Sequence, residues 1–380
     1  MSNAPLSLTN VALTDDDAVR TYTDIFAHTP SRRLIANLDT RLETVDVDGG
    51  WRFPLSVNDG TAAENCYVCS PRAQYVDYAA YELARLDNPL VEKPLRGLLA
   101  GASALFQLAS LDRVVIVNNW LLSTNLYSRG WYGQGLKNLL GSLRACYPTH
   151  AILFRSLNAR QNPALLPALR SAGARLLASR VVWHYDGARA FFTRTPDYRR
   201  DLRLLEKSEW EIVTHDCLRA DDMPAFARLY EQLYVEKYTA LNPRYTARFL
   251  AECHACGLLR FQGIRECATG RWLGVLGCFE RDGVLTAPIV GYDTHLPQSA
   301  GLYRALMALV LRETVRRGLL LNLSAGAGHF KRQRGGEPCA EFTAVFDAHL
   351  PRVRRWPWQV LATLSRRVAL PLAWRVEVGR

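Results

Sequence analysis

The segment from 284 to 317 combines a strand-like run, a short loop and a helix-like run, an order suited to anion binding. Its loop, Gln298-Ser299-Ala300-Gly301, passes directly into the helical pattern of residues 302–317. The first N–H groups of a helix have no acceptor within that helix, and the helix dipole adds positive potential at the same point. Small residues let a phosphate approach the main chain closely. The loop is therefore predicted to bind a pyrophosphate group.

Two titratable side chains follow the strand-like run. Asp293 and His295 are candidates for a general base, because a carboxylate and an imidazole can each accept a proton from a reacting amine. Asp293 equally fits a role in stabilising the loop. His295, which precedes Leu296-Pro297, equally fits an exposed position.

A second polar cluster, Ser324 to Gly336, places His329, Lys331 and Arg334 between two glycine turns. It is not a dinucleotide fingerprint, because Lys331 stands where the third glycine is required, and no Gly-Lys-Ser/Thr follows as in a P-loop. Lys331 and Arg334, at helical spacing, are predicted to bind a substrate carboxylate or phosphate. The alternative is a solvated basic turn.

The first half of the chain places polar side chains at the ends of strand-like runs. Asn119 and Asn125 follow the run that begins at Arg113, and Asn158 follows the run 151–156. Ligands of α/β proteins bind at such strand ends, so these residues are candidates for substrate binding. Asn also satisfies main-chain groups at strand ends, which is the structural alternative.

The elements around these residues alternate between strands and helices, which indicates the α/β class. Predicted strands cover 113–123, 151–156, 175–185, 210–214, 259–265, 272–280, 284–292, 319–323 and 341–347. Predicted helices cover 136–146, 163–172, 223–238, 245–257 and 302–317, with a short helix or loop at 329–334. The later order repeats an earlier one, with Ser156 and Ser324 at equivalent places 324 − 156 = 168 residues apart. No clear hairpin strands precede Arg113.

The repeat suggests two similar domains joined by a charged linker. The predicted parts are an N-terminal extension (1–45), a first domain (46–186), a linker (187–208), a second domain (209–350) and a basic amphipathic tail (351–380). The second domain has the more complete pattern and is the predicted catalytic one.

The second half resembles the GNAT superfamily of acyl-CoA-dependent N-acyltransferases, and the whole chain resembles a tandem GNAT of the FemAB-like and cellulose-biosynthesis acetyltransferase branch. The resemblance includes the element order and Gln298-x-x-Gly301, which is similar to the family's Q/R-x-x-G-x-G/A motif. Tyr303 replaces the small residue at its last position. In the first half, Arg129 to Gly135 resembles the same motif with one extra residue. The resemblance implies two domains, each with a mixed, splayed central sheet flanked by helices.

The resemblance implies direct attack of an amine on a coenzyme A thioester, with no covalent acyl-enzyme and no metal. A main-chain N–H near Gly291–Asp293 would polarise the thioester carbonyl, and Tyr292 is counted among the cofactor-binding residues. Ser324 or His329 would protonate the leaving thiolate. The acceptor would be a small or medium amine. The FemAB-like branch uses aminoacyl-tRNA, which is the first alternative donor. A non-catalytic module that binds an acylated metabolite is the second.

Composition leaves these functions open but excludes others. The 380 residues are 49% hydrophobic and 22% charged, as in globular proteins rather than disordered ones. The net charge is +11, mostly from Arg, which suits an anionic ligand such as a nucleotide, a nucleic acid or a membrane surface. With three Asp at 15–17 in place of an apolar leader and nine Cys, an odd number, the chain is predicted to be cytoplasmic, with free thiols. The tail, rich in Trp, Leu and Arg, is a candidate for peripheral membrane contact or for packing on its own domain.

Overall fold

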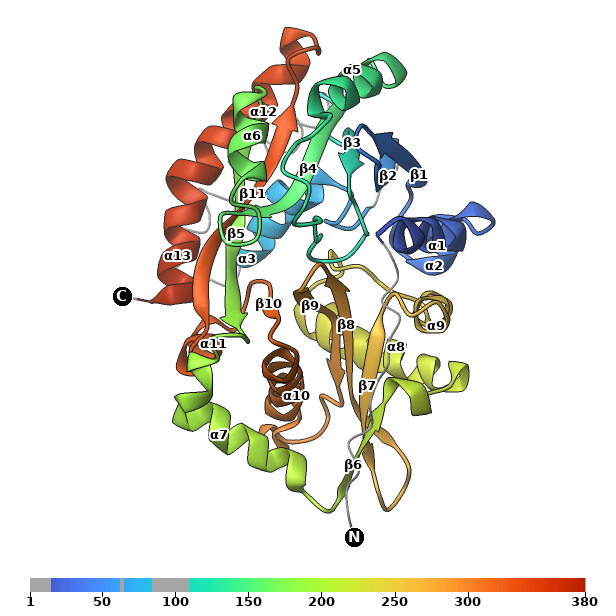
Figure 1. Ribbon diagram of the computed structural model, residues 1–380, viewed down its shortest axis with the longest axis vertical. Coiled ribbons are helices and arrows are strands. Elements are labelled where there is room, and N and C mark those ends of the chain that lie inside the picture. The colour runs from blue at the N-terminus through green and yellow to red at the C-terminus, as the bar shows by residue number, and fades with distance from the viewer. Residues whose placement is uncertain (1–14, 62–64, 84–108, 380) are drawn as a thin grey trace.

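Eleven strands form a single mixed sheet in the computed structural model, which describes residues 15–61, 65–83 and 109–379 (Figure 1). Residues 1–14 of the predicted N-terminal extension lie outside the described residues. The sheet order is β1-β2-β3-β4-β11-β5-β10-β9-β8-β7-β6. The strands are β1 (Arg41–Val47), β2 (Trp51–Asp59), β3 (Arg113–Val117), β4 (Ala151–Asn158), β5 (Arg175–Asp186), β6 (Trp210–Thr214), β7 (Arg260–Glu266), β8 (Trp272–Arg281), β9 (Val284–Tyr292), β10 (Leu320–Asn322) and β11 (Glu337–Phe346).

Helices flank both halves of this sheet (Figure 1). The longer ones are α1 (Asp15–Ala27), α5 (Leu136–Cys146), α8 (Met223–Glu231), α9 (Ala247–Ala255), α10 (Leu302–Arg317), α12 (Arg352–Leu364) and α13 (Leu370–Val378). The shorter ones are α2 (Ser31–Leu34), α3 (Tyr78–Leu83), α6 (Leu165–Ser171), α7 (Pro196–Leu202) and α11 (Gly328–Gln333). The α/β class predicted from the alternation is confirmed. Within the described residues, no helix is long and apolar enough to cross a membrane, and no three His, Cys, Asp or Glu side chains gather as metal ligands.

Helix α10 has the predicted bounds because a glycine brackets each of its ends. Gly301 and Gly318 both adopt left-handed backbone, with φ of 81° and 63°, which stops regular structure at little steric cost. Nine of its sixteen residues are buried. The helix packs against β8, β9 and β5, so its first turn is held firmly beside the sheet (Figure 1).

Two strand pairings join the halves of the chain into one sheet. β11, although it lies near the C-terminus, pairs antiparallel with both β4 and β5 of the first half. β5 in turn pairs with β10 of the second half. Each half therefore contributes strands that pair with strands of the other, and the sheet has no break at the predicted boundary. The predicted domain boundaries stay predictions.

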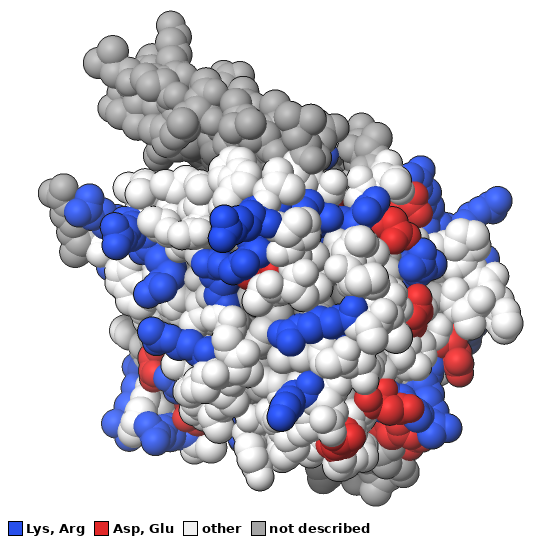
Figure 2. Space-filling view, turned by 90° about the horizontal axis from the view of Figure 1, so that it is seen from above, with Lys and Arg blue, Asp and Glu red and all other residues white. Residues whose placement is uncertain are grey.

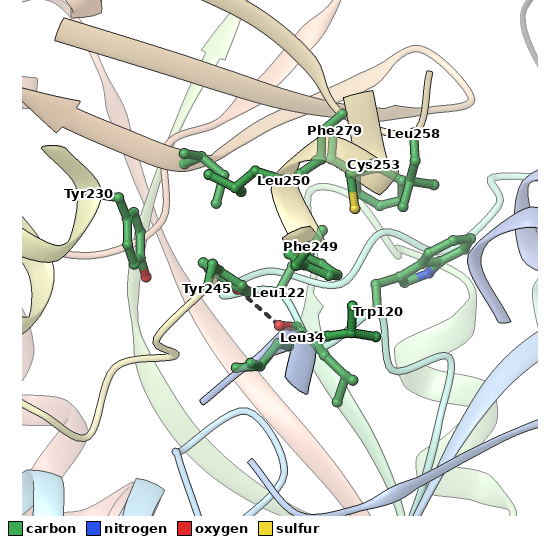
Figure 3. Packing of buried hydrophobic residues seen from close by; sticks show 14 of the residues in the cluster. Leu34, Trp120, Leu122, Tyr230, Tyr245, Phe249, Leu250, Cys253, Leu258 and Phe279 are labelled. Carbon is green, nitrogen blue, oxygen red and sulfur yellow. Dashed lines mark hydrogen bonds between the residues drawn. The ribbon is translucent and has the colours of Figure 1, made fainter. Parts of the chain in front are cut away.

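A shared hydrophobic core also joins the two halves (Figure 3). Leu34 and Trp120 come from the first half, whereas Tyr245, Phe249 and Phe279 come from the second. Tyr245 Oη donates a hydrogen bond to the main-chain oxygen of the first-half residue Leu121, at 2.9 Å. Burial of large aromatic side chains across this junction makes the relative placement of the halves part of the folding core.

The first half departs from the prediction at two places. A hairpin does precede Arg113: β1 and β2 pair antiparallel over Arg41–Val57 to Val47–Trp51, so the expectation that hairpin strands are missing is wrong. The strand predicted over 113–123 ends at Val117, because Asn118 and Leu121 both take positive φ. Ser156 and Ser324, predicted to be equivalent, share left-handed backbone, with φ of 61° and 57°.

Candidate functional site

The predicted anion-binding loop lies at the start of α10, as the sequence indicates. Residues Gln298–Ala300 form one 3₁₀ turn, and Gly301 reverses the backbone into the helix. The Ala305 N–H bonds to the Gly301 carbonyl, whereas the N–H groups of Leu302, Tyr303 and Arg304 have no acceptor among the described residues. Three main-chain donors, supported by the helix dipole, are therefore available at this point.

A pocket of about 430 Å³ opens at this helix end. It is lined by Tyr292, Asp293, Leu296, Pro297, Gln298, Ser299, Gly301, Leu302, Tyr303, Arg304 and Phe330. Five predicted site residues are among them, namely Tyr292, Asp293, Gln298, Ser299 and Gly301. Ala300 belongs to the same turn but does not line the pocket.

The sheet diverges beside the pocket because β10 is short. β10 and β9 pair in parallel over three residues only, from Leu320–Val284 to Asn322–Thr286, and β9 continues to Tyr292 without that partner. The Asp293 N–H donates to Leu273 on β8, at 2.9 Å. Consecutive peptide groups of a strand face opposite edges, so the Tyr292 N–H faces the side that β10 leaves open. This main-chain group can polarise a carbonyl placed between the diverging strands.

Aromatic rings form one wall of the pocket. The Tyr303 ring centroid lies 6.2 Å from that of Tyr292 and 4.9 Å from that of Phe330. Burial raises the pKa of the Tyr303 hydroxyl above its ordinary value, so the hydroxyl stays protonated near neutral pH. Tyr303 lies on the first turn of α10, so its ring takes up space in the pocket beside the free N–H groups.

Arg334 lies behind this wall in a buried ion network. Its Nε donates to Asp201 Oδ2 at 2.5 Å, and its guanidinium lies 3.5 Å from the centroid of the Phe330 ring. The second oxygen of Asp201 accepts from Arg304 Nε at 2.7 Å. As a whole residue Arg334 is only 4% exposed, and its guanidinium also donates to the Phe330 carbonyl at 3.0 Å. Its charge is therefore satisfied within the protein.

Lys331 is also enclosed by the protein. Its Nζ donates to the main-chain oxygens of Leu323, Ser324 and Ala325, at 2.7 to 3.2 Å. Burial lowers the pKa of Lys331 to about 7, against the opposing effect of the Glu377 carboxylate. The lysine therefore shapes the glycine turn after β10, and its predicted role in substrate binding has no exposed donor to support it.

Of the predicted acid–base residues, Asp293 is hydrogen-bonded within the protein, whereas the two histidines are exposed. Asp293 is buried and receives hydrogen bonds on both oxygens, from Arg271 Nη1 at 2.5 Å and from the His295 N–H at 3.0 Å. These two hydrogen bonds stabilise the loop after β9, which is the role that the sequence predicts for Asp293 as an alternative to catalysis. His295 and His329 are exposed, each next to a loop or helix residue that lines the pocket, and Ser324 is half-buried.

The three first-half asparagines are interior residues. The amides of Asn119, Asn125 and Asn158 are fully or almost fully buried. Asn119 donates to Ser56 Oγ at 2.8 Å, Asn125 accepts from the Trp120 N–H at 3.1 Å, and Asn158 donates to Gln161. Each satisfies local polar groups, so the structural alternative accounts for them and they are not part of the pocket.

Six of the residues that line the pocket were absent from the predicted site, namely Leu296, Pro297, Leu302, Tyr303, Arg304 and Phe330. Arg304 lies three residues after Gly301, on the first turn of α10, and a basic residue at that spacing is the signal that would have identified it. Phe330 was part of the second cluster, but only the fold brings α11 to the same pocket.

No family model and no curated protein sequence matches this chain. Several solved structures are similar to it. FemX matches 92% of this chain and 99% of its own, with 9% identity and a TM-score of 0.51. A tandem GNAT protein from the clavulanic acid biosynthesis pathway matches 88% of this chain and 96% of its own, with 14% identity and a TM-score of 0.42. L-PGS from Bacillus licheniformis matches 61% and 78%, with 11% identity and a TM-score of 0.45.

The match to FemX extends over both halves of the chain. The predicted tandem GNAT-like fold is therefore confirmed as a fold. At 9% identity the likeness concerns the fold alone.

Proposed function

We propose that this chain is an acyltransferase that moves an acyl group from a coenzyme A thioester to an amine. The supporting observation is a pocket of about 430 Å³ beside the main-chain N–H groups of Leu302, Tyr303 and Arg304, which have no acceptor in the described part of the chain. Such an arrangement binds the diphosphate of a nucleotide without a dedicated basic side chain.

The chemistry assigned to each group is limited. The α10 amides hold the diphosphate, and the Tyr292 N–H stabilises the oxyanion that forms when the amine attacks the thioester carbonyl. The carbon–sulfur bond then breaks, and the thiolate takes a proton. His295 and His329 are the exposed groups proposed to accept and return protons, and Ser324 remains the second donor proposed for the thiolate. Proximity in the ternary complex supplies the remaining acceleration.

Ser299→Asp tests the diphosphate site. The new carboxylate lies on the pocket wall, beside the expected diphosphate, where like charges a few ångströms apart repel by about 1 to 4 kcal/mol, depending on solvent screening. We expect acetyl-CoA and longer acyl-CoA thioesters to bind roughly 30-fold more weakly in calorimetry. Stability should not fall, because an acidic residue near a helix N-terminus stabilises it by about 0.3–1 kcal/mol.

The matched control is Ser299→Asn, which is similar in size and uncharged. Binding by Ser299→Asn close to that of the parent chain, together with weak binding by Ser299→Asp, supports the diphosphate site. Equal affinity for all three proteins would place the nucleotide elsewhere and would remove the basis of the proposal.

Aminoacyl-tRNA is a second candidate donor, and the aromatic wall specifically favours it. Tyr292, Tyr303 and Phe330 present rings on which an unpaired base can stack, and Tyr303 narrows the approach to the diphosphate site. Stacking on an aromatic side chain contributes about 1–3 kcal/mol per base. Tyr303→Ala should therefore weaken aminoacyl-tRNA binding about 5- to 150-fold, whereas acyl-CoA held by main-chain amides should bind about as before. Binding of tRNA should also weaken steeply with salt.

A further inference from the structure

The last helical segment of the chain carries most of the exposed apolar surface. Among the described residues, ten large hydrophobic side chains are exposed, and seven of them lie between 352 and 378. Val353, Leu364 and Val376 are 64%, 46% and 75% exposed. Single exposed apolar residues are common on proteins, but a concentration of this kind marks an interaction surface.

These side chains form one line along the segment. The apolar stripe consists of Val353, Trp356, Val360, Leu364, Val368, Leu372 and Val376, mostly four residues apart. On a regular α-helix each four-residue step would rotate the line by about 40°. The turn Ser365–Ala369 is a π-helix, whose wider i→i+5 turn offsets that rotation. The stripe therefore stays on one face for about 35 Å, at 1.5 Å per residue.

The opposite face of the segment is anchored on the protein. Trp358, Leu361 and Ala362 are buried in a core cluster with β3 and β4. Ser365 Oγ accepts a hydrogen bond from the Ala178 N–H on β5, at 3.1 Å. Glu377 accepts from the Gly326 N–H at 2.9 Å. These contacts hold α12 and α13 against the sheet, so the apolar stripe is presented outward on a rigid support.

The charges beside the stripe are almost all positive. Residues 352–378 contain six Arg and one acidic residue, Glu377, which faces the protein. Within the described part of the chain, Arg352, Arg355, Arg366, Arg367 and Arg375 form no salt bridge. On the face seen in Figure 2, on which α12 begins, Lys and Arg cover more of the surface than Asp and Glu do. A hollow of about 310 Å³ lies on the same helix, lined in part by Val360 and Leu364.

We propose that the apolar stripe and its arginines dock this chain on the surface of an anionic lipid bilayer. The helix would lie in the plane of the interface, with the stripe among the acyl-chain ends near the headgroups and the arginines at the phosphates. A second copy of the chain is a poorer occupant, because two such faces would bring ten unpaired guanidinium groups together. The surface is separate from the α10 pocket, so this inference does not depend on the proposed donor.

The test is cosedimentation of the full chain with vesicles of phosphatidylcholine alone or mixed with phosphatidylglycerol. We expect binding to the mixed vesicles that weakens with salt, and little binding to the neutral ones. Leu364→Asp with Val368→Asp should reduce partitioning at least about tenfold. Arg366→Gln with Arg367→Gln should reduce it about 25-fold at low salt.

Each double variant has a control with the same change in net charge. Phe191→Asp with Tyr132→Asp changes two exposed aromatic residues elsewhere, and Arg170→Gln with Arg312→Gln removes two exposed arginines elsewhere. Both controls should bind nearly as the parent chain does. Three results would each overturn the proposal. The first is absence of binding to anionic vesicles, and the second is a control variant that weakens binding as much as its test variant. The third is a dimer in light scattering that Leu364→Asp dissociates.

Discussion

Removal of Asp201 should cost more stability than removal of any surface acid, because it holds two arginines. Its side chain is 2% exposed and contacts Arg334, 5% exposed, at 2.5 Å and Arg304, 35% exposed, at 2.7 Å. Asp201→Ala leaves the Arg334 guanidinium buried without a counter-charge, which typically costs about 3–5 kcal/mol. The half-exposed Arg304 pair adds at most about 1 kcal/mol after solvent screening. We therefore expect a loss of about 4 kcal/mol.

Equilibrium unfolding in urea measures this loss, with Arg334→Met and the double variant Asp201→Leu/Arg334→Met completing a cycle. The double variant should lose clearly less than the sum of the single ones, because it leaves no unpaired buried charge. Asp201→Asn keeps one acceptor oxygen and should fall between the parent chain and Asp201→Ala. A loss below about 1 kcal/mol for Asp201→Ala, or additive single effects, would refute the assignment of a buried charge pair.

The remaining predictions concern one pH effect and two local contacts. His184 is fully buried, and neither ring nitrogen has a hydrogen-bond partner among the residues that the structure describes. Burial, with Arg160 nearby, lowers its pKa to about 3. Because the unfolded chain takes up this proton at a higher pH than the folded protein does, the free energy of unfolding should fall as the pH drops from about 6.5 toward 3. The expected loss at pH 5 is about 2 kcal/mol. His184→Leu should remove this pH dependence, which urea unfolding at several pH values would measure. Arg271→Ala should cost about 1 kcal/mol in the same assay and weaken acyl-CoA binding in calorimetry, because Asp293 loses its partner. Gly187→Ala should lower the free energy of unfolding by about 3 kcal/mol, because the new Cβ would lie 2.1 Å from a carbonyl oxygen of α10. Gly318→Ala has open space around it and should lower the free energy of unfolding by only about 1–2 kcal/mol, because of its positive φ.

Local signals were enough to predict the second half of the fold. β9 and α10 have the bounds that periodicity and flanking glycines indicate, because the relevant forces act within one turn or one strand. The pairing of β11 between β4 and β5 was not predictable. It joins residues more than 150 positions apart, and no local pattern encodes which edges of a sheet meet.

The placement of candidate residues at the pocket could be predicted where the main chain determines it, and could not be predicted where burial does. Gln298 to Gly301 needed only the loop–helix order, which the sequence displays. Lys331 and Arg334 have the charge expected of ligand-binding residues, but the groups that satisfy them are main-chain oxygens and Asp201, a residue 133 positions from Arg334. Charge is visible in a sequence, whereas a partner that neutralises it is not.

The continuous sheet makes the pocket depend on both halves of the chain. β10, whose short length opens the sheet beside Tyr292, is held on its other side by β5 of the first half. The turn that follows β10 is held by Lys331, and Tyr185 of β5 donates to the Lys331 carbonyl at 2.9 Å. A change in β5 would therefore alter the strand separation at the pocket without touching a ligand. The first half therefore supports the proposed site through its strands, whereas its candidate asparagines lie in the interior and do not line the pocket.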